Sequence, residues 1–273
     1  MSAITPFEEL LQEVTRAAHD LWIKGWAERN AGNISVRLKQ EQMPETGTAN
    51  QDDWRELGFE APALAGQRFL FSSTGCHMRN VELLPERYLG VIELDEQAQR
   101  YRRVWGFSGG GRPTSELAPH LLAHDARAQA SAGADRVVMH THAPALIALT
   151  YSLDLDTARL TRLLWEMHTE CVVVFPAGCG FVPWSVPGSI ELARATAREL
   201  NKRTLALWQF HGAVGTGPDI DTAFGLIDTA EKAAQIYTHA AASGGIRNRL
   251  STAQIAALAR AFSVTPDPEL FGE

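Results

Sequence analysis

The stretch Asp135-Arg-Val-Val-Met-His-Thr-His142 organises the interpretation of the whole chain. Its apolar run, Val137–Met139, is typical of a buried strand. His140 and His142 follow two residues apart, so on an extended chain both side chains leave the same face. Histidine is a frequent zinc ligand, and a catalytic zinc usually takes three protein ligands and keeps one position open. The stretch therefore predicts a metal site that needs a third ligand.

The third ligand is expected from a second strand that ends in a histidine. Residues 205–210 are largely apolar, and His211 follows them, ahead of a glycine-rich stretch, 212–217, that is expected to be a turn. Among the nine histidines, His140, His142 and His211 alone end apolar strands beside small residues. Zinc is the first choice for three imidazoles, with manganese, cobalt or iron as alternatives. Taken singly, each could be an ordinary surface or core histidine.

Composition narrows the class of protein. The 273 residues are 45% hydrophobic and 21% charged, which suits one globular domain over 1–273. The net charge of −7 and the lack of a long basic cluster argue against nucleic acid as a partner. No signal-peptide pattern and no membrane-length apolar run occur, so a soluble cytoplasmic protein is expected. Cys76, Cys171 and Cys179 show no CxxC spacing, which argues against a disulfide framework or a thiolate zinc site.

The order of the elements predicts the fold class. Apolar residues recur at helical spacing in seven segments, 6–24, 113–130, 143–151, 156–167, 189–202, 219–242 and 251–262. Strands are expected at 34–38, 68–73, 88–94, 101–107, 135–142, 170–176 and 205–211, with a surface excursion at 39–67 and a Gly/Pro loop at 178–188. Several strands are joined by hairpins, which favours an α/β fold of the α+β type: a single domain with a mixed, largely antiparallel sheet flanked by helices.

Three turns rich in small and polar residues could bind an anion. They contain Asn30 and Asn33, Ser73-Thr-Gly75, and Thr114-Ser115 ahead of a predicted helix. Free backbone N–H groups and hydroxyls in such turns can cradle a phosphate. Each turn also has an ordinary explanation, because asparagine, serine and glycine are common in turns and Thr114 or Ser115 could cap the helix. Glu116 would then be favoured simply by the helix dipole.

Taken together, these motifs carry a resemblance to a known family. In order and spacing, the chain resembles the class II aldolase/adducin family through Asn30-Ala-Gly-Asn33, Ser73-Thr-Gly75, Pro113-Thr-Ser-Glu116, His140-Thr-His142 and Phe210-His211-Gly212. The likeness runs nearly end to end. It is greatest to the members that cleave L-rhamnulose 1-phosphate into dihydroxyacetone phosphate and L-lactaldehyde in rhamnose catabolism. It implies one zinc ion per subunit, held by His140, His142 and His211.

The resemblance also implies roles for other residues. Glu116 would be the catalytic base at the carbon that becomes nucleophilic in the condensation direction. Glu170 would come from a neighbouring subunit and handle a proton at the aldehyde half, which implies an obligate oligomer, a homotetramer by family precedent. Taken by itself, Glu170 could equally be a solvated residue ahead of a buried strand. The implied phosphate contacts are Asn30, Asn33, Thr74, Gly75, Thr114 and Ser115.

One departure and several alternatives accompany this interpretation. Ser73 stands where related chains tend to have glycine, so the geometry of the phosphate loop is in question. The same fold and metal could serve an L-fuculose-1-phosphate aldolase, a ribulose-phosphate 4-epimerase or a thiosugar-phosphate dehydratase. A non-catalytic adducin-like binding module would have no need of three ligands and a base. A zinc hydrolase would fit three histidines but leaves the three phosphate-type turns unexplained.

Overall fold

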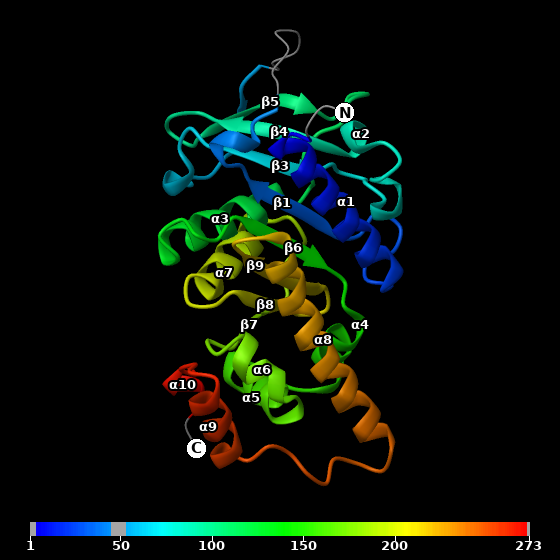
Figure 1. The fold of residues 1–273 in the computed structure, drawn as a ribbon, viewed down its shortest axis with the longest axis vertical. Helices are drawn as coiled ribbons and strands as arrows, with labels where there is room; N and C mark the ends of the chain where they lie inside the picture. Colours follow the sequence, from blue (N-terminus) through cyan, green and yellow to red (C-terminus); the bar gives the residue numbers. More distant parts are fainter. Residues whose placement is uncertain (1–3, 45–52, 272–273) are drawn as a thin grey trace.

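Nine strands form one continuous sheet in the computed structural model, which describes residues 4–44 and 53–271 (Figure 1). The order across the sheet is β2-β5-β4-β3-β1-β6-β9-β8-β7, and every neighbouring pair is antiparallel except β7 with β8. The expected mixed, largely antiparallel sheet is therefore confirmed. The strands are β1 (Asn33–Arg37), β2 (Arg55–Glu56), β3 (Arg68–Ser72), β4 (Leu89–Leu94), β5 (Arg100–Gly106), β6 (Val137–Thr141), β7 (Cys179–Val182), β8 (Leu205–Trp208) and β9 (Gly212–Gly217).

Helices cover both faces of this sheet. They are α1 (Pro6–Ile23), α2 (Pro85–Tyr88), α3 (Leu117–Ala130), α4 (Pro144–Ser152), α5 (Thr157–Met167), α6 (Thr169–Val174), α7 (Ile190–Leu200), α8 (Ile220–Ala242), α9 (Thr252–Ala261) and α10 (Pro268–Phe271). The long helices α1 and α8 run across the sheet in Figure 1 and share one apolar core with it, whereas α3 and α7 pack on the other face. Three short 3-10 turns occupy 40–42, 62–64 and 78–80. No helix of the described residues is both long and apolar enough to cross a membrane.

Strand β6 shows how the sequence pattern divides these two faces. Val137 and Met139 join the core under α1 and α8, and Val138 joins the core under α3 and α7. All five residues of β6 are buried, as a strand in the centre of a covered sheet must be. By this alternation His140 lies on the α3 and α7 face, where its ring packs against Trp208 with the centroids 4.4 Å apart.

Most expected helices begin where a side chain can cap them. Thr5 and Glu8 form a capping box at the start of α1, and Asp156 caps α5. Ser189, Asp219 and Ser251 cap α7, α8 and α9. Each of these side chains accepts a bond from a backbone N–H in the first helical turn that would otherwise lack a partner. The helix starts of the C-terminal half are thus confirmed to within a residue or two.

The prediction of a strand over 170–176 is wrong. Residues 169–174 form helix α6, and the strand that pairs with β8 is β7, inside the predicted Gly/Pro loop. A short apolar run does not distinguish a buried strand from a buried helical segment, and here packing against α5, α8 and α9 outweighs the strand preference of three valines. The predicted excursion at 39–67 contains two 3-10 turns and β2, and its residues 45–52 lie outside the described part of the chain.

Residues 212–217 form a central strand and not the predicted turn. β9 lies between β6 and β8, fully buried. A Cβ atom on Gly215 would lie 2.4 Å from the backbone oxygen of Ala223, and one on Gly212 would lie 2.4 Å from that of Thr141. Glycine is therefore required here for close packing of helix α8 and strand β6 on β9, and not for a turn.

The helix predicted from Pro113 starts later than expected. Helix α3 begins at Leu117, and Glu116 occupies the N-cap position without a capping bond from its side chain. Ser73 and Pro113 form an isolated bridge, which ties the segment ahead of the helix to the loop after β3. The expectation that Thr114 or Ser115 occupies the N-cap position is thus wrong, because Pro113 is bridged to Ser73 and a turn at 115–116 separates Thr114 from the start of the helix.

Candidate active site

One cavity, at the ends of the central strands, is lined by most of the predicted site residues. Its volume is about 340 Å³. The turn after α1, the loop after β3, the segment before α3 and three histidines from β6 and the β8–β9 hairpin form its walls. The predicted residues among its lining are Asn30, Asn33, Ser73, Thr74, Gly75, Thr114, Ser115, Glu116, His140, His142 and His211. Segments distant in the sequence therefore meet here because β1, β3, β6 and β9 are close neighbours in the sheet.

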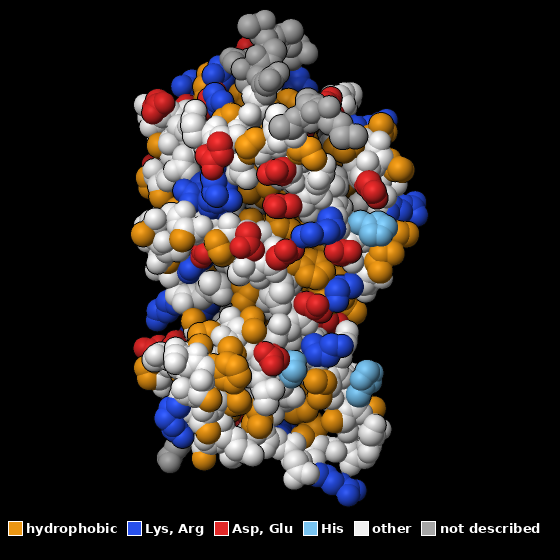
Figure 2. Space-filling view, in the orientation of Figure 1, with side chains coloured by type: hydrophobic (Ala, Val, Ile, Leu, Met, Phe, Trp, Pro, Cys, Tyr) orange, Lys and Arg blue, Asp and Glu red, His pale blue; other side chains and the backbone are white. Residues whose placement is uncertain are grey.

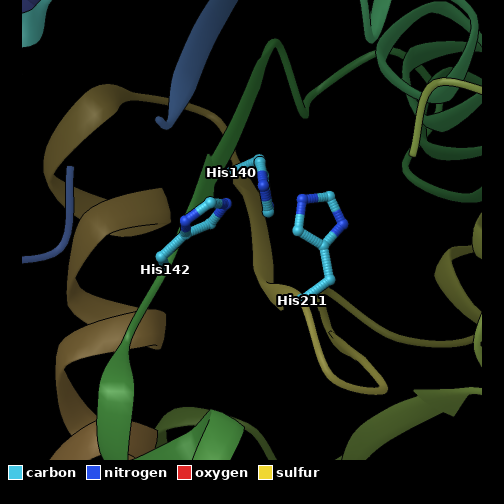
Figure 3. Close-up of side chains that lie close together, drawn as sticks. All are labelled: His140, His142 and His211. Atoms are coloured by element: carbon cyan, nitrogen blue, oxygen red, sulfur yellow. The ribbon is translucent and has the colours of Figure 1, made fainter. Parts of the chain in front are cut away.

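The three histidines converge on one point. Their potential ligand atoms all lie within 4.8 Å of one another, and Figure 3 shows the three rings facing a common centre. His140 comes from β6, His142 follows this strand directly, and His211 sits in the hairpin that joins β8 to β9. Antiparallel pairing of β6 with β9 brings the hairpin beside the end of β6. The arrangement is that of a three-ligand metal site.

Protein partners fix the orientation of two of these rings. His140 donates from Nδ1 to the backbone oxygen of Ala213 at 3.0 Å, and His142 donates from Nδ1 to Glu28 Oε1 at 2.7 Å. A neutral imidazole that donates from Nδ1 carries its free lone pair on Nε2. The Nε2 atoms of His140 and His142 are therefore the ones prepared for a ligand, and Glu28 is the kind of partner that orients metal-binding histidines.

Burial favours the neutral form of His140 and His211 and leaves His140 Nε2 and His211 Nδ1 without a hydrogen-bond partner. His140 is 1% exposed, and its Nε2 atom is buried with no hydrogen-bond partner. Burial, with the neighbouring His142, holds the pKa of His140 well below its ordinary value. Burial and the neighbouring His140 lower the pKa of His211 to about 3. Neutral rings with an unsatisfied, inward-facing nitrogen fit a divalent metal, because a cation supplies the partner that a buried lone pair otherwise lacks.

Glu116 stands beside this cluster. Its Oε2 lies 3.6 Å from His140 Nε2, and its Oε1 lies 3.6 Å from His211 Nε2. The residue is 6% exposed, and Asn33 donates from Nδ2 to its Oε2 at 2.8 Å. A carboxylate in this position faces both the Nε2 atoms of His140 and His211 and the interior of the cavity. We refer to His140, His142, His211 and Glu116 as the histidine wall.

A second part of the cavity lining presents free donors. The side chains of Asn30, Thr74 and Ser115 and the backbone N–H of Gly75 find no hydrogen-bond partner among the described residues. Thr114 differs, because its hydroxyl accepts from the Glu116 N–H at 3.3 Å. We refer to Asn30, Thr74, Gly75, Thr114 and Ser115 as the donor wall. Several unpaired donors on separate turns suit a ligand with many acceptor oxygens.

Ser73 does not distort the donor wall. The left-handed conformation in this loop falls on Gly75, with φ of +70°, and Ser73 is not among the residues with positive φ. The backbone N–H of Ser73 donates to Tyr88 O at 2.8 Å, and that of Thr74 donates to Arg112 O at 2.9 Å. Glycine is therefore not needed at position 73, and serine can stand there without changing the backbone conformation of the loop.

The cavity includes residues that the sequence did not single out. Glu28 and Arg29 line it beside Asn30, and Arg29 is the one Lys or Arg side chain in the described lining. Arg29 adopts a positive φ of 50°, which a non-glycine residue rarely does outside a constrained turn. The signal for both was their place in the turn that carries Asn30 and Asn33. Nothing in the sequence paired Glu28 with His142, which is distant along the chain.

Glu170 does not reach this cavity. It lies exposed in the first turn of α6, and it is absent from the described lining. Within one chain, therefore, the predicted second carboxylate and the histidine wall are separate. The expectation that Glu170 acts in the site of a neighbouring subunit is not tested by a single chain and stays a prediction.

Comparison with known proteins identifies the class. The family model described as Class II Aldolase and Adducin N-terminal domain matches residues 12–238, and the chain belongs to this family. It is similar to a rhamnulose-1-phosphate aldolase of Mannheimia succiniciproducens, with 47% identity over 94% of this chain and 95% of the relative. One of Pectobacterium carotovorum is 46% identical, over 94% of each chain. Among solved structures, a sugar-phosphate aldolase from Thermotoga maritima is similar with a TM-score of 0.74 and 30% identity, over 87% of this chain and 97% of that one.

Proposed function

We propose that the protein cleaves L-rhamnulose 1-phosphate into dihydroxyacetone phosphate and L-lactaldehyde, in a reversible metal-dependent retro-aldol reaction. The observation that carries the proposal is the meeting of three histidines, a buried glutamate and a set of free donors in one cavity. The curated relatives named rhamnulose-1-phosphate aldolase match nearly the whole chain, which favours this substrate. We treat residues 1–273 as one catalytic domain, because α9, beyond the family match, packs on α6.

The reaction needs two proton transfers and a place for negative charge. The C4 hydroxyl loses its proton, the C3–C4 bond breaks with its electron pair left on the C3 fragment, and C3 then takes up a proton. His140, His142 and His211 would hold a divalent metal, zinc by preference, which supplies Lewis-acid stabilisation of the charge that develops. Glu116 gives the proton to C3 in cleavage and removes it in condensation. Its position beside His140 and His211, in the lining of the cavity, suits this role.

The donor wall would bind the phosphate. Thr74, Gly75 and Ser115 supply hydroxyl and backbone donors without protein partners, and Arg29 supplies a cation. A dianionic phosphate is best bound by several charge-assisted hydrogen bonds from fixed positions. Asn30, Asn33 and Thr114 complete the set that family resemblance assigns to the phosphate. Binding by this remote group would hold C3 close to Glu116.

The proton at the C4 hydroxyl needs a further group. We propose Glu170 of a neighbouring subunit for this role, since Glu170 is exposed and lies away from the cavity of its own chain. On this proposal the active enzyme is a homo-oligomer, a tetramer by family precedent, with each site at a subunit boundary. Mixing an inactive Glu170→Gln chain with an inactive Glu116→Gln chain tests it. Recovery of activity in the mixed oligomer supports shared sites, and its absence contradicts them.

A coupled assay for dihydroxyacetone phosphate tests the main proposal. L-Rhamnulose 1-phosphate and L-fuculose 1-phosphate are compared, each with and without a chelator. Release that prefers the rhamnulose substrate and disappears on chelation supports the reaction, the specificity and the metal dependence together. Release from L-fuculose 1-phosphate alone would change the assigned substrate to L-fuculose 1-phosphate. Release from neither, with metal bound, would move the assignment to the epimerase or dehydratase activities of the family.

A further inference from the structure

A chain of hydrogen bonds runs from Glu116 into the interior of the protein. Asn33 Nδ2 donates to Glu116 Oε2 at 2.8 Å, and Asn33 Oδ1 is bonded to His120 Nε2. His120 Nδ1 lies 2.6 Å from Ser35 Oγ, which lies 2.8 Å from His124 Nε2. All five residues are buried, and Ser35, His120 and His124 are each 1% exposed. Strand β1 supplies two members and helix α3 supplies two, with Glu116 at the start of that helix.

The direction of these bonds is determined by chemistry at the Glu116 end. An ionised carboxylate only accepts, so the Asn33 amide must turn its nitrogen to Glu116 and its oxygen to His120. His120 then has to donate from Nε2, which leaves Nδ1 as an acceptor for the hydroxyl proton of Ser35. Ser35 in turn accepts from His124 Nε2. Every donor in the chain therefore points towards Glu116.

Burial supports the neutral histidines that this direction requires. Burial lowers the pKa of His120 to about 4, and burial with His120 and Arg37 nearby holds that of His124 well below its ordinary value. Each ring thus carries one N–H, which matches one donor and one acceptor role for His120. Aligned hydrogen bonds in a dry interior polarise one another, so the donor that reaches Glu116 is strengthened by those behind it.

The chain reaches Glu116 through Asn33, which lines the cavity with it, from three residues that do not. Ser35, His120 and His124 are not among the residues that line the cavity. Asn33, at the end of this chain, donates a hydrogen bond to Oε2 of Glu116. Oε1 has no hydrogen-bond partner among the described residues and lies 3.6 Å from His211 Nε2. The two oxygens of the carboxylate therefore differ: one is held by the protein and the other is available to a ligand.

We propose that His120 and Ser35 are positioning residues for Glu116, which hold Oε2 through Asn33 so that Oε1 transfers the proton. The inference rests on the proposed function of Glu116 and deepens it. It also changes the expected role of Asn33, whose amide binds Glu116 and His120 first and leaves a single N–H for a phosphate. Loss of a residue that orients a functional side chain through a hydrogen bond commonly changes activity by about 10- to 100-fold.

Two variants at position 120 and one control test the role in catalysis. His120→Leu removes the donor to Asn33, whereas His120→Gln keeps an N–H near the position of Nε2. Thr161→Val is the control, because Thr161 is fully buried and its hydroxyl bonds the backbone of Cys179, away from the cavity. All three variants lose buried hydrogen bonds, so the melting temperature alone does not separate them. The kcat, the KM, the zinc content and the melting temperature are measured for each.

We expect His120→Leu to lower kcat by at least about 10-fold, with KM changed by less than about 3-fold and zinc content unchanged. His120→Gln should recover most of the loss. Ser35→Ala, one bond further away, should show a smaller loss than His120→Leu. Thr161→Val should melt at a lower temperature yet turn over normally. A His120→Leu enzyme with normal kcat per zinc, or a loss that only follows the melting temperature, would overturn the role.

A second measurement does not depend on activity. In protein labelled with ¹⁵N at histidine, the ring nitrogens of His120 and His124 should show the N–H on Nε2, with protons protected from exchange with solvent. Ser35→Ala should remove this protection at His124. A proton on Nδ1 of His120 would overturn the inference whatever the reaction proves to be. Absent turnover in the unmodified enzyme, combined with the expected tautomers, would contradict the proposed reaction and leave the hydrogen-bond chain standing.

Discussion

The two walls of the cavity are built on different principles. On the histidine wall, Nδ1 of His140 and of His142 and Oε2 of Glu116 each have a protein partner, so only selected atoms face the interior. On the donor wall, the side chains of Thr74 and Ser115 have no partner among the described residues. The first wall is therefore organised by the protein and the second by its ligand. On the proposed function, the positions of the metal ligands and of the base are set during folding, whereas the phosphate contacts form on binding.

Removal of the metal is the strongest test of the organised wall. Dialysis against a chelator should abolish activity, and one equivalent of zinc per chain should restore it, because the three histidines would hold the cation that supplies the Lewis-acid stabilisation. The melting temperature should also fall on removal, since binding to the folded state alone stabilises it. Full activity in protein shown to be free of metal would contradict the site.

Replacement of Glu116, the proposed base, should have the second-largest effect on activity. Glu116→Gln should lower kcat by about 10³-fold, within the range that a general base contributes. The zinc content should not change, because the three histidine ligands remain. Glu191, an exposed glutamate on α7, is the matched control, and Glu191→Gln should be normal. Near-normal turnover of the Glu116→Gln enzyme would remove Glu116 from the mechanism.

The contact behind the metal ligands should have an intermediate effect. Glu28→Gln weakens the bond that orients His142, and the affinity for zinc should fall by about 10- to 100-fold. Activity should return to nearly normal at saturating zinc, in contrast to the loss at Glu116. A competition titration with a chromophoric chelator gives the affinity. An unchanged affinity would show that the histidine wall does not depend on this partner.

Substitutions in the donor wall should raise KM. Thr74→Ala removes one hydroxyl donor, and loss of a hydrogen bond to a charged group, about 1.5–3 kcal/mol, corresponds to a rise in KM of about 10-fold or more. Thr74→Ser keeps the hydroxyl and should stay close to normal. The zinc content should be the same in both variants, which separates the two walls experimentally. A Thr74→Ala enzyme with normal KM would exclude this contact.

The smallest effect is a dependence of stability on pH. Because His120 has a pKa of about 4 in the folded protein against an ordinary 6.5, the unfolded chain takes up a proton that the folded chain refuses between these values. The contribution of His120 to the free energy of unfolding should therefore fall by up to about 1.4 kcal/mol per pH unit between pH 6.5 and about 4, and His124, His140 and His211 add to the slope of the whole protein. Denaturation of metal-free protein should show a shallower slope for His120→Gln than for the unmodified chain. Equal slopes would mean that His120 is not kept neutral.

The sequence predicted this fold best where one local signal sufficed. The helices predicted at 6–24, 156–167 and 219–242 form as α1, α5 and α8, and each begins beside a side chain, Thr5, Asp156 or Asp219, that caps it within its own first turn. Val137–Met139 and Cys171–Val174 show the limit, since both are apolar runs and only the first forms a strand. Contacts made by distant helices decide between the two, and no local pattern contains those contacts.

In the site too, the sequence predicted individual residues from local patterns but not the contacts between distant segments. The metal cluster followed from His140 and His142 at alternate positions and from a second strand before His211, and the structure brings these three together. The pairs Glu28 with His142 and Asn33 with Glu116 could not be predicted, because each joins segments that meet only after the sheet has formed. Family resemblance assigned roles to single residues but not the bonds between them.

The place of β1 in the sheet has a consequence for synthesis. β1 is the first strand of the chain, yet it lies between β3 and β6. As the chain leaves the ribosome at about 5–20 residues per second, β1 can pair with β3 early but has an open edge until Val137–Thr141 emerges. An unpaired apolar edge is prone to association with other chains. The strand that carries Asn33 and Ser35 is thus open to association during synthesis, and slow translation before β6 should increase aggregation of the nascent protein.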